Sequence, residues 1–139
     1  MSVFDTIRIA ASGLTAERLR MDVAASNLAN AQTTRTQNGP AGTPYEAEAV
    51  VFQAQQMGPM AAAQGVSAVA IVKPPSPNVR VYDPTNPDAD RTGFVNYPNV
   101  DVASQMTDMM GAARSYQVDA TVAQAAKQQA LDALDLGKA

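Results

Sequence analysis

Three aspartates and a glycine between residues 83 and 93 have the residue types of a calcium-binding loop. Asp83, Asp88 and Asp90 precede Gly93, and calcium loops combine carboxylate oxygens with a glycine turn. The EF-hand pattern also needs an acidic or amide residue at position 92 and a glutamate at position 99. This chain has threonine and asparagine there, so the pattern favours a turn with solvated aspartates over a metal site.

Glu46 and Glu48 are a second candidate, as paired carboxylates for acid–base catalysis. Two residues apart on a strand they share one face, which we expect to be solvated. The chain has neither histidine nor cysteine, which excludes histidine-based triads, catalytic thiolates, and imidazole or thiolate metal ligands. We therefore expect no enzyme, no metal and no cofactor.

A long helix is predicted at the C-terminal end, from Val102 to Leu136. Apolar or small residues recur there at alternating steps of three and four, which is typical of one helix face. Asp101 can cap its start, and Gly137 can close it in a left-handed conformation. Such a helix would be roughly 50 Å long. The stripe comprises Val102, Met106, Met109, Ala113, Tyr116, Ala120, Ala123, Ala130 and Leu134, with Lys127 at its one gap.

The first thirty residues show the same spacing and predict a second long helix, with Ser2 and Asp5 resembling a capping box. Arg18 and Lys127 interrupt the two otherwise apolar stripes. Either they extend into solvent, or they fix the register or face a polar channel, and both interpretations stay open. The N-terminal stripe comprises Phe4, Ile7, Ala11, Leu14, Met21, Ala25 and Leu28.

Two asparagines stand near the end of the N-terminal helix. An asparagine inside a helix is unfavourable unless its amide reaches a backbone or partner group. Asn27 and Asn30 are three residues apart and share a face. They predict a specific polar contact where the helix ends.

The middle of the chain predicts a small β unit. Residues 45–52 alternate as a half-buried strand, and residues 66–73 are the best strand candidate. Residues 79–82 could pair with residues 66–73 across a proline turn at positions 74–77. The fold class is therefore α+β, with long N- and C-terminal helices paired as a coiled coil, a small central β unit and proline-rich loops. We expect two units, residues 1–35 plus 99–139 and residues 36–98.

Composition predicts a marginally stable monomer. Of 139 residues, 46% are hydrophobic but only 5% are aromatic, and the abundant alanines bury little area each. We expect the termini to become ordered on docking against neighbouring copies. A net charge of -3 without a basic cluster argues against a nucleic-acid partner. No apolar run is long enough to insert in a membrane.

Several motifs resemble the rod, hook and related axial proteins of the bacterial flagellum. The N-terminal signature of that family resembles residues 11–16 (ASGLTA) and 26–34 (SNLANAQTT). Four central segments narrow the resemblance to proximal-rod members, namely residues 81–84, 86–90, 93–95 and 97–101. Residues 106–117 and 133–138 resemble the C-terminal helix of those members.

The resemblance implies a structural subunit of the basal-body proximal rod, required for motility and exported through the flagellar type III apparatus without a cleaved signal peptide. In the periplasm it would self-assemble with other rod subunits and copies of itself around the export channel. The helices (1–35 plus 99–139) would form the inner, channel-facing layer. The alternative is a secretion-associated adaptor that binds one client through its β unit.

The expected helix-packing and assembly interface comprises Phe4, Ile7, Ala11, Leu14, Met21, Ala25, Asn27, Leu28, Asn30, Met106, Met109, Ala113, Tyr116, Ala120, Ala123 and Leu134.

Overall fold

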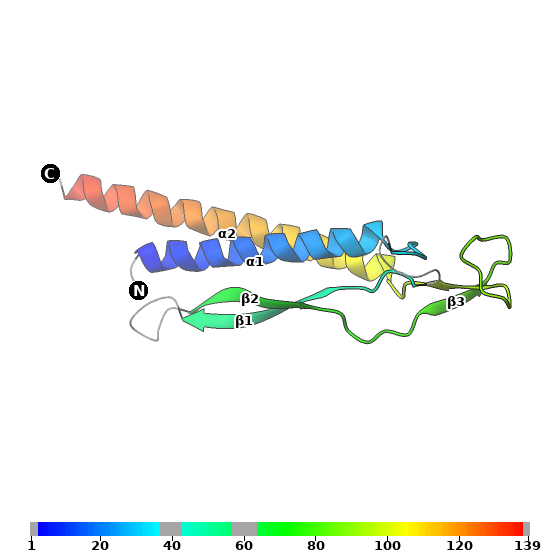
Figure 1. The fold of residues 1–139 in the computed structure, drawn as a ribbon. Helices are drawn as coiled ribbons and strands as arrows, with labels where there is room; N and C mark the ends of the chain where they lie inside the picture. The colour runs from blue at the N-terminus through cyan, green and yellow to red at the C-terminus, as the bar shows by residue number, and fades with distance from the viewer. Residues whose placement is uncertain (1–2, 37–42, 57–63, 138–139) are drawn as a thin grey trace.

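Two long helices lie side by side, and a narrow strip of β-structure runs along one of them (Figure 1). This computed structural model describes residues 3–36, 43–56 and 64–137. The α+β prediction is confirmed. The elements in chain order are α1 (Val3–Ala29), β1 (Ala49–Gln56), β2 (Gln64–Val72), β3 (Val79–Tyr82), β4 (Phe94–Tyr97) and α2 (Val102–Leu136).

The C-terminal helix has the predicted bounds. Its first turn is capped by Asp101, whose carboxylate accepts a hydrogen bond from the Ala103 N–H at 3.1 Å. At its other end Gly137 has φ -77° and ψ -10°, so the predicted left-handed closure is wrong. The Gly137 N–H donates to the carbonyls of Ala133 and Asp135 instead. These bonds satisfy the last turn without a positive φ.

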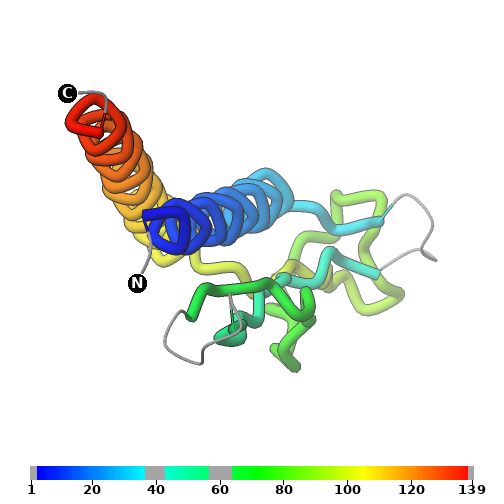
Figure 2. The backbone as a smooth tube through the Cα atoms, turned by 90° about the vertical axis from the view of Figure 1, so that its left-hand side faces the viewer, coloured from blue at the N-terminus to red at the C-terminus, as the bar shows by residue number. Residues whose placement is uncertain are grey.

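The two helices are antiparallel, and both chain ends lie at the same end of the molecule (Figure 1). α1 also has its predicted position, although Ser2 of the expected capping box lies outside the described residues. α2 has 35 residues against 27 in α1. Its C-terminal end therefore projects beyond the start of α1 (Figure 1), and Figure 2 shows this end lying to one side of α1.

The strands form two separate antiparallel pairs. β1 pairs with β2 from Ala49↔Val72 to Gln56↔Gln64, and β3 pairs with β4. The predicted pairing of residues 79–82 with residues 66–73 is therefore wrong. Prolines at 74, 75 and 77 lack an N–H donor and restrict the residue before each of them. The chain accordingly runs on from β2 to β3 in the same direction instead of turning back (Figure 1).

The first strand begins and ends four residues later than predicted, at Ala49–Gln56 instead of residues 45–52. The reason is a competing partner, because the Tyr45 hydroxyl and the Glu48 backbone hydrogen-bond with the side chain of Asn27 in α1. The second strand differs less, at Gln64–Val72 instead of residues 66–73.

The described residues bury only a small apolar core. It consists of Ala10, Ala16, Val23, Ala24, Val95, Ala112 and Ala126. The chain exposes 9457 Å² of surface, whereas a compact 14.5 kDa protein exposes about 6,900 Å². This surface is that of an extended subunit with much apolar area left uncovered. Among the residues described, no helix has both the length and the apolar character of a membrane span.

Candidate functional site

The face of α1 that contacts α2 carries polar and small residues at intervals of seven. We call Gly13, Arg20 and Asn27 the contact face. A heptad interval returns to nearly the same side of a helix, so these residues form one line along α1. Their respective partners on α2 are Asp119, Asp108 and Gln105.

The apolar stripe predicted for α1 lies beside this contact face. Its members Ile7, Leu14, Met21 and Leu28 are half-buried at the edge of the helix pair. Its other members are exposed, and Phe4 is 71% exposed. We call these exposed members, together with the interrupting and equally exposed Arg18, the open stripe; it comprises Phe4, Ala11, Arg18 and Ala25.

On α2 the fully buried residues are likewise displaced by one position from the predicted stripe. Ala112 and Ala126 are buried, while the predicted Ala113 is half-buried and Lys127 is exposed. Met109, Ala120, Ala123 and Ala130 are half-buried, and Val102, Met106, Tyr116 and Leu134 are exposed. Within one subunit, the predicted stripes are therefore only partly covered.

The side chain of Asn27 joins three elements. It is 1% exposed, and its Oδ1 accepts hydrogen bonds from the Tyr45 hydroxyl and the Glu48 N–H, both at 2.9 Å. Its Nδ2 donates to the Glu48 carbonyl at 2.8 Å and to Gln105 Oε1 at 3.0 Å. Every donor and acceptor position of the amide is occupied. The amide thus connects α1, the approach to β1 and the start of α2.

Asn30 acts more locally. Its Nδ2 donates to the Ser26 carbonyl at 2.9 Å, and its Oδ1 accepts from the Thr33 hydroxyl at 3.2 Å. The Ser26 carbonyl also accepts from the Asn30 N–H at 3.1 Å, so the Asn30 side chain adds a second bond to the last turn of α1. The predicted polar contact at the end of the helix is confirmed, with Asn27 making the long-range part of it.

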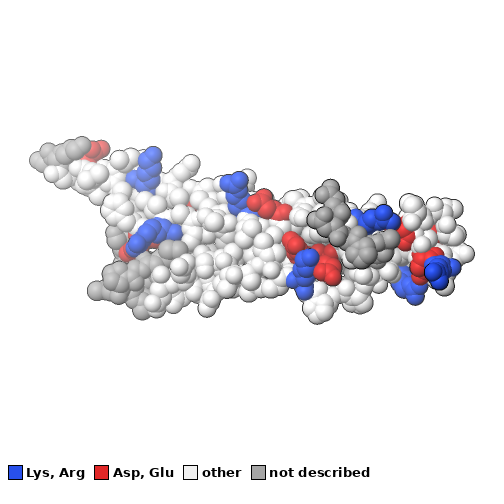
Figure 3. Space-filling view, in the orientation of Figure 1, with Lys and Arg blue, Asp and Glu red and all other residues white. Residues whose placement is uncertain are grey.

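Charge pairs between the two helices are few and partly solvated. Arg20 Nη2 lies 3.0 Å from Asp108 Oδ1, and both side chains are more than two-fifths exposed. A pair of this kind contributes only about 0.2 to 1 kcal/mol. Glu17 Oε2 is buried without a hydrogen-bond partner in the described chain, and Arg20 Nη1 is 4.0 Å from it. On the face shown in Figure 3, acidic and basic side chains lie next to one another instead of forming patches of one sign.

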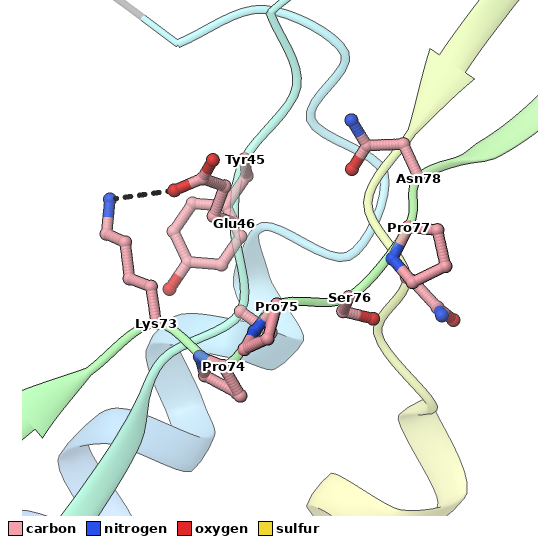
Figure 4. A pocket seen from close by; sticks show the side chains of 10 residues that line it. Tyr45, Glu46, Lys73, Pro74, Pro75, Ser76, Pro77 and Asn78 are labelled. Carbon is pink, nitrogen blue, oxygen red and sulfur yellow. Dashed lines mark ion pairs between the residues drawn. The ribbon is translucent and has the colours of Figure 1, made fainter.

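The two glutamates considered as a catalytic pair have separate roles. Glu46 Oε2 lies 3.6 Å from Lys73 Nζ, whereas the backbone of Glu48 binds Asn27. The Glu46–Lys73 pair stands beside a groove of about 370 Å³ between residues 45–47 and the proline segment 73–78 (Figure 4). The ion pair joins the segment before β1 to the segment after β2, at the open end of the hairpin.

The loop aspartates accept hydrogen bonds that shape turns. Asp90 Oδ1 accepts from the hydroxyl and N–H of Thr92 and from the Phe94 N–H, at 2.6 to 3.0 Å. The Thr92 hydroxyl and then the Phe94 N–H lower the pKa of Asp90 to about 2. The Thr85 hydroxyl, which donates to Asp83 Oδ1 at 2.7 Å, likewise lowers the pKa of Asp83.

The third aspartate of this loop faces the segment that follows α1. Asp88 accepts from the Thr34 hydroxyl at 2.8 Å and pairs with Arg35 at 2.5 Å. The three carboxylates therefore serve different partners. No three acidic side chains in the described ranges are grouped to hold a metal ion.

Sequence reasoning missed several residues of the helix contact, including Gly13, Asp108 and Asp119. A signal was present at Gly13, because a glycine inside a helix costs about 1 kcal/mol relative to alanine and so often marks a close approach. The acidic partners carried no such signal. Their roles depend on how α1 and α2 are aligned, which only the folded chain shows.

The comparisons with known proteins match the same two helices. The family of flagella basal body rod proteins matches residues 7–36, and the C-terminal family of flagellar basal body rod FlgEFG proteins matches residues 91–136. The flagellar basal-body rod protein FlgC of Escherichia coli O157:H7 is 44% identical over 138 residues, covering 99% of this chain and 100% of the relative. The chain belongs to the FlgC family. FlgC proteins of Salmonella typhimurium and Bacillus subtilis are 42% and 39% identical, each over 99% of this chain and 100% of the relative.

Membership of the FlgC family gives the chain its function. It is a structural subunit of the flagellar basal-body rod and not an enzyme. The two family matches fall on α1 and on β4 with α2. Resemblance to FlgC, in contrast, extends over the whole chain, including the β1–β2 hairpin.

Proposed function

We propose that this subunit assembles through its terminal helices into the tubular proximal rod, where α1 and α2 pair as a coiled coil and pack against the helices of neighbouring subunits. The observation that carries this proposal is the open stripe beside the contact face. Its heptad spacing is that of a packing surface, yet one copy of the chain leaves it exposed. A neighbouring helix would cover it.

The arrangement of layers supports an inner position for the helices. The β1–β2 hairpin lies against one side of α1 only (Figures 1 and 2). Residues 1–35 plus 99–139 would then form the channel-facing layer, with residues 36–98 outside it. Arg18 and Lys127 are exposed. We propose that these two cations fix the register between subunits or face the channel.

The partners in this proposal are other rod subunits, copies of the same chain and the flagellar type III export apparatus. Export would bring the chain to the periplasmic rod without a cleaved signal peptide. A secretion-associated adaptor with a single client is not supported, because the curated relatives are rod proteins over their full length.

Incorporation into basal bodies tests the proposal. Ala113 is half-buried beside the fully buried Ala112, so a glutamate at 113 places a charge at the edge of the helix pair. We expect Ala113→Glu to be exported but absent from purified basal bodies, whereas Ser104→Glu, exposed near the start of α2, is incorporated normally. Normal incorporation of Ala113→Glu would contradict the helical interface.

A further inference from the structure

A groove of about 380 Å³ lies where α1, α2 and the β1–β2 hairpin meet, and Asp119 of α2 lies at its edge. The carboxylate of Asp119 rests directly on Gly13, and a Cβ at residue 13 would overlap Asp119 Oδ2. Ile9, Ser12 and Phe52 form other parts of the groove wall. The glycine therefore allows an acidic group to sit at the junction of the three elements.

Asp119 has no partner of its own. It is half-buried, and within the described ranges it makes neither a hydrogen bond nor an ion pair. The nearby Ser12 hydroxyl is already engaged, since it donates to the Ile9 carbonyl at 2.7 Å and accepts from the Val66 N–H at 3.1 Å. An unpaired carboxylate at the edge of a groove attracts a cation from a neighbouring molecule.

Four described cations have no carboxylate within ion-pair distance, namely Arg18, Arg91, Arg114 and Lys127. Arg18 differs from the others because alanines flank it at heptad positions 11 and 25, on the open stripe. Small neighbours let another helix approach its backbone closely. Arg18 is also nine residues from Ile9, which is half a turn around α1, so it faces away from the groove of its own subunit.

We propose that Asp119 receives the guanidinium of Arg18 from a second copy of this chain, with the open stripe of one subunit lying in the groove of the next. This inference rests on the proposed helical assembly and adds one specific contact to it. Because the two surfaces differ and lie on different sides of α1, the contact is heterologous and can repeat from copy to copy. A buried ion pair at one heptad position also fixes the register between helices.

Charge exchange between the two positions tests the contact in the full-length chain. We expect Asp119→Arg and Arg18→Asp each to lower the number of copies in purified basal bodies by about tenfold, because each variant opposes like charges. The double variant should restore incorporation. The matched control is Arg114→Asp with Asp132→Arg, two exposed sites on α2 where single changes should have no effect on incorporation. Loss in both single variants without rescue would overturn the proposal.

Cross-linking gives a second readout that does not depend on rescue. The chain contains no cysteine, so single cysteines can be introduced without background. We expect basal bodies that contain a mixture of Arg18→Cys and Asp119→Cys chains to yield a dimer with a short bismaleimide, and basal bodies with either variant alone to yield none. Absence of the mixed dimer would reject this contact. If the mixed dimer were absent but Ala113→Glu still blocked incorporation, the proposed helical assembly would stand without the contact between Arg18 and Asp119.

Discussion

The side chain of Asn27 binds the backbone of Glu48 in both directions. Nδ2 donates to the Glu48 carbonyl at 2.8 Å, and Oδ1 accepts from the Glu48 N–H at 2.9 Å. An amide side chain thereby replaces the neighbouring strand that this backbone would otherwise require. The hairpin is attached to the end of α1 by this exchange, and Gln105 extends the connection to α2.

Replacing Asn27 should loosen all three elements together. Asn27→Ala leaves the Tyr45 hydroxyl, the Glu48 backbone and Gln105 without their partner, so we expect a loss of about 3 kcal/mol in the free energy of unfolding. Asn30→Ala, which removes local bonds only, should cost about 1 kcal/mol or less. Urea unfolding followed by circular dichroism measures both. Equal effects of the two variants would contradict the junction described here.

The two described glycines inside helices should respond differently to alanine. A Cβ at Gly111 meets nothing within 4 Å, so Gly111→Ala should raise the unfolding free energy by about 0.5 to 1 kcal/mol. Gly13→Ala should not raise the unfolding free energy, because the Asp119 carboxylate must leave its position. The double variant Gly13→Ala with Asp119→Ala should raise it. Thermal melting of the three variants is the measurement, and an increase in stability from Gly13→Ala alone would contradict a close contact between Gly13 and Asp119.

The helices could be predicted from sequence because their signals are local. Asp101 and the repeat of apolar residues gave the bounds of α2 correctly. Strand pairing is a long-range property, and the prediction failed there. Residues 79–82 do form a strand, but their partner is Phe94–Tyr97, a short segment with no clear alternation. The hairpin partner of residues 64–72 lies earlier in the chain.

The candidate site was predictable only in part, for a related reason. Apolar periodicity identifies surfaces that are buried in some assembly, and it does not distinguish contacts within a chain from contacts between chains. The stripes of Ala25 and Ala113 were therefore predicted as packing surfaces and stay a prediction, since one subunit covers them only in part. Of the contact face of Gly13, Arg20 and Asn27, only Asn27 was predicted. Polar residues such as Gln105 become recognisable once the helices are aligned.

The stability of the turn between β3 and β4 should depend on pH. The pKa of Asp90 is lowered from 3.8 to about 2 in the folded chain, so the carboxylate stabilises the turn fully above pH 3.8 and loses this effect as the pH falls toward 2. NMR titration of the Thr92 and Phe94 amide signals should show a midpoint near the lower value. Asp90→Asn should abolish that transition. A midpoint at or above 3.8 would contradict the hydrogen bonding at Asp90.

A pair of alanine variants should separate folding from assembly. Ala112 is fully buried between the helices, and Ala25 on the open stripe is exposed. We expect Ala112→Glu to lower the free energy of unfolding by about 3 kcal/mol, because it buries an unpaired charge. Ala25→Glu should change it by less than about 0.5 kcal/mol yet prevent incorporation into basal bodies. Chemical unfolding and immunoblots of basal bodies give the two readouts, and normal incorporation of Ala25→Glu would count against the open stripe.

Amide hydrogen exchange tests the central claim most directly, by comparing the free chain with the same chain in isolated basal bodies. If the helices become rigid only when neighbours cover their open surfaces, exchange in α1 and α2 should slow by at least about tenfold on incorporation, with a smaller change in β3 and β4. Equal protection of both helices in the free and the incorporated chain would contradict the account.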